Sequence, residues 1–134
     1  MSGSQISATP QTVVLVDDDP AVLNSLKFAL ELEGFAVEAY QAGSQLLSKG
    51  RLPSDGFLII DYNLPGMNGL DLLAVLRERR VALPAILITT HPSAYLRKRA
   101  AAVGLPIVEK PLLDDALVEA LRGFLKQPPA AGLP

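Results

Sequence analysis

The chain of 134 residues contains no cysteine, no tryptophan and only one histidine. Without cysteine, it can form neither a disulfide bond nor a cysteine-ligated zinc site. No apolar run approaches the roughly 20 residues that a helix needs to cross a membrane, so we expect no membrane association. The net charge of −2 also argues against non-specific binding to nucleic acid.

The two ends of the chain differ in composition from its middle. Residues 1–11 lack the charged and apolar segments of a signal peptide, so we expect a cytoplasmic location and a flexible N-terminus. Residues 127–134 are rich in proline and alanine, which is typical of a flexible tail or a truncated linker. The hydrophobic content of 49% is sufficient for one packed core. We therefore predict a single domain over residues 12–126.

The stretch from Phe57 to Gly66 is the most informative part of the sequence. Four apolar residues lead without alternation into Asp61, and a Pro-Gly turn follows. Such a run, bounded by turn signals, is typical of a strand in a parallel sheet that helices cover on both faces. Ligands of these sheets bind beyond the carboxyl ends of the strands. Asp61 is therefore a candidate for chemistry, and the alternative is a solvated turn residue.

Strand and helix patterns alternate along the whole chain. The predicted strands cover 12–16, 35–40, 57–60, 85–89 and 107–109. The predicted helices cover 20–33, 44–49, 69–80, 94–103 and 115–126. This alternation predicts an α/β fold, a doubly wound parallel sheet of five strands with five helices.

Side chains that can cap helices support these boundaries. Asp19 precedes Pro20, which suits the first helical position, while Asn68 and Asp114 can cap the third and fifth helices. Apolar residues at helical spacing predict the buried faces. These residues are Val22, Leu26, Ala29 and Leu30 in the first helix, Leu70, Leu73, Ala74 and Leu76 in the third, and Leu117, Leu121, Phe124 and Leu125 in the fifth.

Polar residues follow or end four of the five predicted strands. Asp17 and Asp18 follow the first strand, Asp61 the third, Thr89 ends the fourth, and Lys110 follows the fifth. If the strands are parallel, these side chains lie along one edge of the sheet and form one site. Taken singly, each has another explanation: an acidic neighbour of a helix cap, a threonine suited to a strand, or a surface lysine.

The gathered carboxylates would repel one another, which raises their pKa values unless a cation is bound. Mg²⁺ fits such oxygen ligands, whereas no histidine or cysteine is near enough in sequence to indicate zinc. A metal ion, Lys110 and the Thr89 hydroxyl around a free carboxylate are the parts needed to place a phosphoryl group on Asp61.

Four separated motifs resemble the receiver domain of two-component response regulators. The motifs are Val-Leu-Val-Asp-Asp-Asp-Pro at 14–20, Ile-Ile-Asp-Tyr-Asn-Leu-Pro-Gly-Met-Asn-Gly-Leu at 59–70, Leu-Ile-Thr at 87–89 and Glu-Lys-Pro at 109–111. The resemblance covers nearly the whole chain and implies a flavodoxin-like receiver fold with the strand order 2-1-3-4-5.

The resemblance implies a role for each matched residue. Asp61 corresponds to the phosphoacceptor, which takes a phosphoryl group from a phosphohistidine of a sensor histidine kinase or phosphotransfer protein. Thr89 corresponds to the hydroxyl that follows the phosphoryl group, and Lys110 to the lysine that pairs with it. The peptide bond from Lys110 to Pro111 corresponds to one that is usually cis. Such a protein is not a dedicated enzyme, although it catalyses its own Mg²⁺-dependent phosphorylation and dephosphorylation.

The resemblance also implies the metal ligands. Asp17 and Asp18 correspond to the acidic pair that holds Mg²⁺ together with Asp61, and the backbone carbonyl of Asn63 corresponds to the remaining protein ligand.

The sequence departs from the family pattern at two positions. Ile107 stands where receivers usually carry the switch aromatic, and Thr90 stands where they usually carry a small residue. The resemblance implies that Ile107 occupies the switch position, so the departure concerns how phosphorylation reaches the distant surface rather than whether Asp61 accepts a phosphoryl group. Thr90, Asn63 and His91 are candidates for tuning access to the phosphoryl group, with a surface loop position as the alternative for His91.

A downstream protein or a second copy of the chain is expected to bind the face built from residues 94–126, with no direct nucleic-acid partner. The basic run Arg97-Lys98-Arg99 lies within it, although most such runs are solvated faces. Three alternatives stay open. One is the N-terminal receiver half of a larger DNA-binding regulator. A haloacid-dehalogenase-like phosphatase is disfavoured because Asn63 replaces its second aspartate, and a pseudo-receiver because every phosphorylation residue is present.

Overall fold

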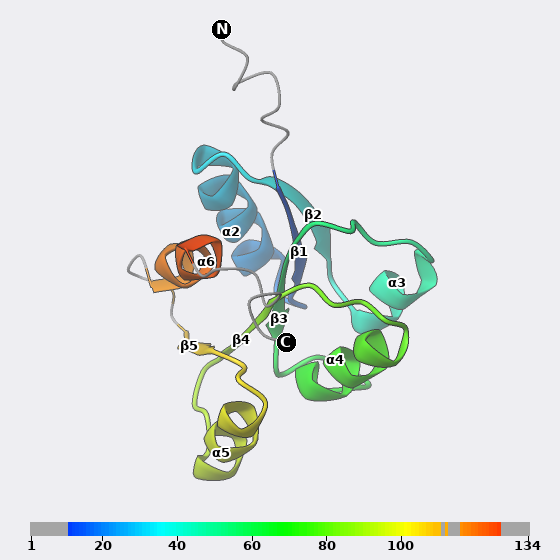
Figure 1. Ribbon diagram of the computed structural model, residues 1–134, viewed down its shortest axis with the longest axis vertical. Coiled ribbons are helices and arrows are strands. Elements are labelled where there is room, and N and C mark those ends of the chain that lie inside the picture. Colours follow the sequence, from blue (N-terminus) through cyan, green and yellow to red (C-terminus); the bar gives the residue numbers. More distant parts are fainter. Residues whose placement is uncertain (1–10, 111, 113–115, 127–134) are drawn as a thin grey trace, which may run out of the picture.

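The computed structural model describes residues 11–110, 112 and 116–126. Five parallel strands form one sheet in the order β2-β1-β3-β4-β5, as predicted (Figure 1). The strands are β1 (Thr12–Val16), β2 (Ala36–Tyr40), β3 (Gly56–Asp61), β4 (Ala85–Thr89) and β5 (Ile107–Glu109). Four predictions fall wholly or partly outside the described residues: all but Gln11 of the predicted flexible N-terminus 1–11, the predicted flexible tail 127–134, the predicted cap Asp114, and Pro111 of the predicted cis bond.

Helices cover both faces of the sheet (Figure 1). The helices of the described residues are α2 (Pro20–Leu32), α3 (Gly43–Ser48), α4 (Gly69–Glu78), α5 (Ala94–Ala102) and α6 (Ala116–Lys126). Leucines of α2 and α6 pack on one face of the sheet, and those of α3, α4 and α5 pack on the other. Within the described ranges, no helix combines the length and the apolar character needed to cross a membrane.

Side-chain caps set the starts of three helices, α2, α4 and α5, and in α5 the Ser93 hydroxyl accepts a hydrogen bond from the Leu96 N–H at 3.0 Å. The Asp19 carboxylate accepts a hydrogen bond from the Ala21 N–H at 2.9 Å, and Pro20 is the first residue of α2. Asn68 caps α4 by accepting from the Asp71 N–H at 2.8 Å. Each such cap typically contributes about 1 kcal/mol to stability. The predicted starts of the first and third helices are thereby confirmed.

The two central strands alternate their side chains between the two halves of the core. In β3, Phe57 and Ile59 pack toward α2 and α6, whereas Leu58 and Ile60 pack toward α3, α4 and α5. All residues of β3 and β4 are buried, which is why their sequences show no polar alternation. The partly exposed β2 lies at the sheet edge, as its mixed sequence predicted.

The predicted buried faces of the helices are wrong at several positions. Ala29, Ala74 and Leu125 are exposed, whereas Leu23 and Leu72 are buried. In α2 and α4 the helix turns so that leucines, rather than neighbouring alanines, meet the sheet. The physical reason is that a leucine removes more apolar surface from water than an alanine does.

Candidate functional site

Three carboxylates gather at the carboxyl ends of the neighbouring strands β1 and β3. Asp17 follows β1 and is completely buried, and Asp61 is the last residue of β3 with 2% of its surface exposed. Asp18 is exposed beside them. One carboxylate oxygen from each residue lies within 4.8 Å of the others. The parallel sheet thus brings together the residues that the sequence placed along one edge.

Lys110 joins two of these carboxylates. Its Nζ lies 3.0 Å from Asp61 Oδ2 and 2.9 Å from Asp17 Oδ2. Its backbone N–H donates to the Thr89 carbonyl at 2.8 Å, which continues the pairing of β4 with β5 and aims the lysine at the site. The sequence predicted that Lys110 lies at the site, but it did not predict that the ammonium bridges Asp17 and Asp61.

The other oxygen of Asp61 is held by the loop that follows β3. Asp61 Oδ1 accepts a hydrogen bond from the Asn63 N–H at 3.0 Å. The Asn63 side-chain amide donates to the Thr89 hydroxyl at 3.5 Å, a long contact between the ends of β3 and β4. Thr89 is 2% exposed, so its hydroxyl lies at the inner edge of the site.

Burial raises the pKa of the Asp61 carboxyl above its usual value. The Asn63 N–H and the Lys110 ammonium favour the charged form, and the Asp17 charge disfavours it, but burial is the largest effect. From the sequence we expected repulsion among the carboxylates to raise the pKa of Asp61. In the structure this repulsion, from Asp17, raises the pKa less than burial does. Burial lowers the pKa of Lys110, but its contacts with Asp17 and Asp61 outweigh this and leave that pKa raised.

The acidic cluster is compatible with a bound metal ion. Three carboxylates and one ammonium leave a formal charge of −2, which a divalent cation would balance. The buried oxygen Asp17 Oδ2 has the Lys110 ammonium in ion-pair range but no hydrogen bond of good geometry. An all-oxygen set of donors suits a hard cation rather than zinc.

Gly69 holds the first turn of α4 against this site. Its N–H donates to the Tyr62 carbonyl at 2.8 Å. A β-carbon at this position would lie only 2.6 Å from the backbone oxygen of Asp61. The sequence motif contains this glycine, but its spacing alone does not reveal that the helix backbone touches the functional residue.

Comparison with known proteins agrees with this geometry. The family described as "Response regulator receiver domain" matches residues 13–122. The chain belongs to the receiver domain family of response regulators. Receivers of this family are phosphorylated by histidine kinases or phosphotransfer proteins.

The receiver is similar to part of several longer proteins. It is 36% identical over 116 residues to the transcriptional regulatory protein FixJ of Rhizobium meliloti, covering 84% of this chain and 56% of that protein. It is 34% identical over 120 residues to the transcriptional regulatory protein TrcR of Mycobacterium tuberculosis, covering 89% and 47%. The receiver therefore spans about half the length of these relatives.

Solved structures share the fold. The crystal structure of FixJ-N has a TM-score of 0.75 and 33% identity, with 85% of this chain and 92% of that chain covered. A CheY-like receiver domain from Methanospirillum hungatei has a TM-score of 0.77 and 28% identity, with 87% and 94% covered. These likenesses confirm the receiver fold that the motifs indicated.

The remaining predicted site residues lie around the receiver site with different exposure. Thr90 and His91 are exposed and directly follow β4. Ile107 is half-buried and packs against the core cluster on the side of α3, α4 and α5. In the predicted partner face, Arg97 pairs with Glu109 at 2.9 Å. The roles assigned to these residues stay predictions.

Proposed function

We propose that the receiver accepts a phosphoryl group on Asp61 from a phosphohistidine of a sensor kinase or phosphotransfer protein. The observation that supports this most is the position of Asp61. It is a buried carboxylate at the end of the central strand, with a second carboxylate and an ammonium in direct contact range of the same site. Burial and a neighbouring cation are conditions under which a carboxylate serves as a nucleophile.

In the proposed step, a carboxylate oxygen of Asp61 attacks the phosphorus of the phosphohistidine. A bond forms between this oxygen and phosphorus, while the bond from phosphorus to the donor imidazole breaks and its electron pair stays on the nitrogen. Lys110 is suited to pair with the negative oxygens of the product, because its Nζ already lies 3.0 Å from Asp61 Oδ2. The Thr89 hydroxyl and the Asn63 amide are suited to donate to the same oxygens.

We also propose that Mg²⁺ is the cation at the acidic cluster. Asp17, Asp18 and Asp61 would hold it, together with the backbone carbonyl of Asn63. When bound, Mg²⁺ would offset the negative charge on the transferring phosphoryl oxygens. The all-oxygen donors and the formal charge of the cluster support this proposal.

Intact-mass measurement tests the phosphoacceptor. With acetyl phosphate and Mg²⁺, the wild type should gain the mass of one phosphoryl group, and Asp61→Asn should gain none. Asp19→Asn is the matched control, because asparagine also caps helices and this change removes a carboxylate next to the metal ligands. Labelling of Asp61→Asn at the wild-type rate would contradict the assignment, as would loss of labelling in Asp19→Asn.

The proposed output is a conformational change. Phosphorylation adds about 1.5 to 2 negative charges at pH 7. At a buried carboxylate, such a charge is expected to shift a pre-existing equilibrium between two receiver conformations. A partner protein or a second receiver would recognise the change at the face of residues 94–126.

A second proposal concerns the chain context. The relatives FixJ and TrcR are named transcriptional regulatory proteins, and the receiver matches about half of each. This favours control of a DNA-binding output domain, with no contact between the receiver itself and nucleic acid.

A further inference from the structure

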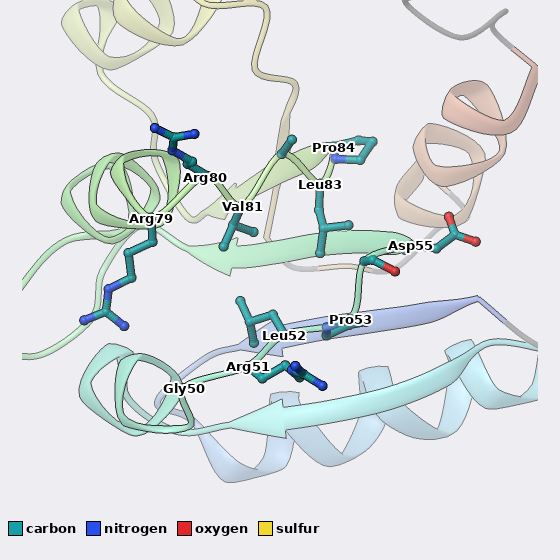
Figure 2. A pocket seen from close by; sticks show the side chains of 13 residues that line it. Gly50, Arg51, Leu52, Pro53, Asp55, Arg79, Arg80, Val81, Leu83 and Pro84 are labelled. Carbon is teal, nitrogen blue, oxygen red and sulfur yellow. The ribbon is translucent and has the colours of Figure 1, made fainter.

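A groove is lined by residues that precede β3 and β4 (Figure 2), so it lies at the end of the sheet opposite the proposed phosphorylation site. Its volume is about 510 Å³, and it lies between residues 50–56 and residues 79–84. The two segments precede β3 and β4, and Gly56 begins β3. Since a parallel strand rises about 3.3 Å per residue, the groove lies roughly 17 Å from Asp61. The proposed phosphoryl transfer therefore does not use it.

The inner walls of the groove are apolar. Leu52 points from one segment toward Val81 and Leu83 of the other (Figure 2). Pro53 and Pro84 also line it. Leu83 is buried in the core, and the other four residues offer apolar surface to a ligand that carries its own apolar side chains.

The rim of the groove is positively charged. Arg51, Arg79 and Arg80 line it, and Asp55 is its single acidic residue. Arg79 donates to the Leu47 carbonyl at 2.8 Å, whereas the exposed guanidinium groups of Arg51 and Arg80 have no hydrogen-bond or ion-pair partner among the described residues. Because the whole chain carries a net charge of −2, this positive charge is a local feature.

The backbone of Arg80 is unusual. Gly34, Gly50 and Gly104 follow the ends of α2, α3 and α5, and all three have positive φ, at 98°, 89° and 67°. Arg80 takes the corresponding place after α4 with a φ of 67°. A residue with a β-carbon is disfavoured in this left-handed conformation. Two of these four helix ends border the groove, and the chain places glycine at the one after α3 but an arginine at the one after α4. Such backbone strain is often found at functional sites.

We propose that this groove binds an extended acidic peptide segment of a partner protein. Carboxylates of the peptide would pair with Arg51 and Arg80, since a guanidinium group can bind a carboxylate through two hydrogen bonds. Alternate apolar side chains would pack against the half-buried Leu52 and Val81, because successive side chains of an extended chain point in opposite directions.

Other occupants fit the groove less well. A small inorganic anion would leave its apolar walls unused. Asp55 and the negative charge of the whole chain disfavour a nucleic acid. Residues 1–10 and 127–134 contain no aspartate or glutamate, so neither segment supplies the acidic side chains.

Amide chemical shifts of the isotopically labelled receiver test the proposal. The probe is an acetylated and amidated eight-residue peptide in which leucine and glutamate alternate. We expect saturable shifts confined to residues 50–56 and 79–84 and their immediate neighbours. A matched peptide with glutamine in place of glutamate should bind about tenfold more weakly, because it lacks the charge-assisted hydrogen bonds.

Arg80→Gly separates binding from folding. Glycine removes the guanidinium group and also relieves the left-handed strain, so this variant should melt at a higher temperature and yet bind the acidic peptide about tenfold more weakly. Arg51→Gln should also weaken binding. Arg99→Gln is the matched control, because it removes an exposed arginine from α5, outside the groove, and should leave the affinity unchanged.

Four results would overturn the proposal. The first is the lack of a saturable shift in the two segments with peptide at about 1 mM, a concentration that detects weak binding. The second is an equal loss of affinity in Arg99→Gln, which would indicate non-specific attraction of charge. The third is the same set of shifts with inorganic phosphate alone, which would indicate a small-anion site. The fourth is concentration-dependent self-association that Arg80→Gly abolishes, which would assign the groove to a second copy.

Discussion

The charged side chains at the two ends of β3 differ in burial and in pairing. At the carboxyl end, Asp61 is buried beside Asp17, and Lys110 lies within 3.0 Å of both. At the amino end, Arg51 and Arg80 are exposed and have no side-chain partners among the described residues. One end contains buried charges held by close contacts, and the other contains free charges on an open rim. The first arrangement suits a reaction with a small group, and the second suits recognition of a larger partner.

The two ends of β3 also differ in what destabilises the folded state. Burying Asp61 disfavours its charged form, so the destabilising feature of the carboxyl end is electrostatic. At the amino end the unfavourable feature is conformational, because Arg80 has positive φ. Changes at each end should therefore respond to different conditions: metal ions and pH at the first, and backbone substitutions at the second.

The largest expected effect is at the amino end. In Gly56→Ala, the new β-carbon would lie 2.0 Å from the Thr12 carbonyl oxygen. Neither backbone can move easily, because Thr12 and Gly56 are paired in neighbouring strands. We expect a loss of about 3 kcal/mol or more in the free energy of unfolding, measured by urea denaturation. Gly66→Ala is the control: its φ is also positive, at 84°, but no atom lies within 4 Å, so it should lose about 1 kcal/mol.

The same substitution at the carboxyl end should affect function as well as stability. In Gly69→Ala, the β-carbon would lie 2.6 Å from the Asp61 carbonyl oxygen. We expect a loss of roughly 2 to 3 kcal/mol in stability and slower phosphorylation by acetyl phosphate, because the contact is with the backbone of the acceptor residue. If the Gly69→Ala variant folds and is phosphorylated by acetyl phosphate at the wild-type rate, then this contact does not position Asp61.

Mg²⁺ should stabilise the carboxyl end of the fold. At a concentration ten times its dissociation constant, a ligand that binds only the folded state adds about 1.4 kcal/mol. Thermal melts with and without Mg²⁺ measure this effect. Asp18→Asn should reduce the response, whereas Asp55→Asn, which removes a carboxylate at the amino end, should leave it intact. If millimolar Mg²⁺ left the melting temperature of the wild type unchanged, this result would argue against the metal site.

A smaller gain in stability is expected from Asp61→Asn without metal. Burial raises the pKa of Asp61 in the folded state, so the folded protein binds this proton more tightly than the unfolded chain does. Ionised Asp61 therefore lowers stability at every pH above its raised pKa, and the penalty disappears as the pH falls through that value toward the unfolded one. Removing the charge should therefore increase stability at pH 7.

Urea denaturation of Asp61→Asn at neutral and acidic pH tests the sign of this effect. The difference from wild type should shrink as the pH is lowered, because wild-type Asp61 then becomes neutral. Asp19→Asn removes a nearby carboxylate that is exposed and should show no comparable gain. A destabilised Asp61→Asn at pH 7 would mean that the contact with Lys110 outweighs the burial of the charge.

Local patterns predicted the strands well, and also that polar residues meet at one edge of the sheet, for a physical reason. β4 and β5 begin and end where the sequence placed them, because buried parallel strands show continuous apolar runs. The residues at the carboxyl ends then meet automatically, since parallel strands share that edge. The bridge from Lys110 to Asp17 was not predictable, because it depends on side-chain directions across β1, β3, β4 and β5.

Features that depend on distant segments were the ones that sequence reasoning missed. The groove joins the turn before β3 to the turn before β4, and neither turn has a motif of its own. The strain at Arg80 was hidden because the helix was predicted to continue to that residue, whereas α4 ends at Glu78. A non-glycine residue gives no sign in the sequence that its φ is positive.

The smallest expected effect concerns the transmission of the signal away from Asp61. Ile107 pairs with Leu87 of β4 and is half-buried against the core cluster beside α3, α4 and α5. Its branched β-carbon restricts its first side-chain torsion, and it has no ring to swing into space that Thr89 leaves. We therefore predict that a beryllofluoride mimic of phosphorylation shifts the amides of the loops after β3 and β4 strongly, and those of α5 and α6 only weakly.

Amide chemical shifts with and without the mimic measure this difference, and Ile107→Tyr sharpens it. A tyrosine at this position restores a ring and should enlarge the shifts along α5 and α6, while the shifts near Asp61 stay the same. Equally large shifts along these helices in the wild type, with new dimerisation, would show that isoleucine transmits the signal as well as a ring does. Residues 50–56 and 79–84 should not shift in either protein. If they did, the two ends of β3 would be coupled rather than independent, and peptide binding in the groove would depend on phosphorylation.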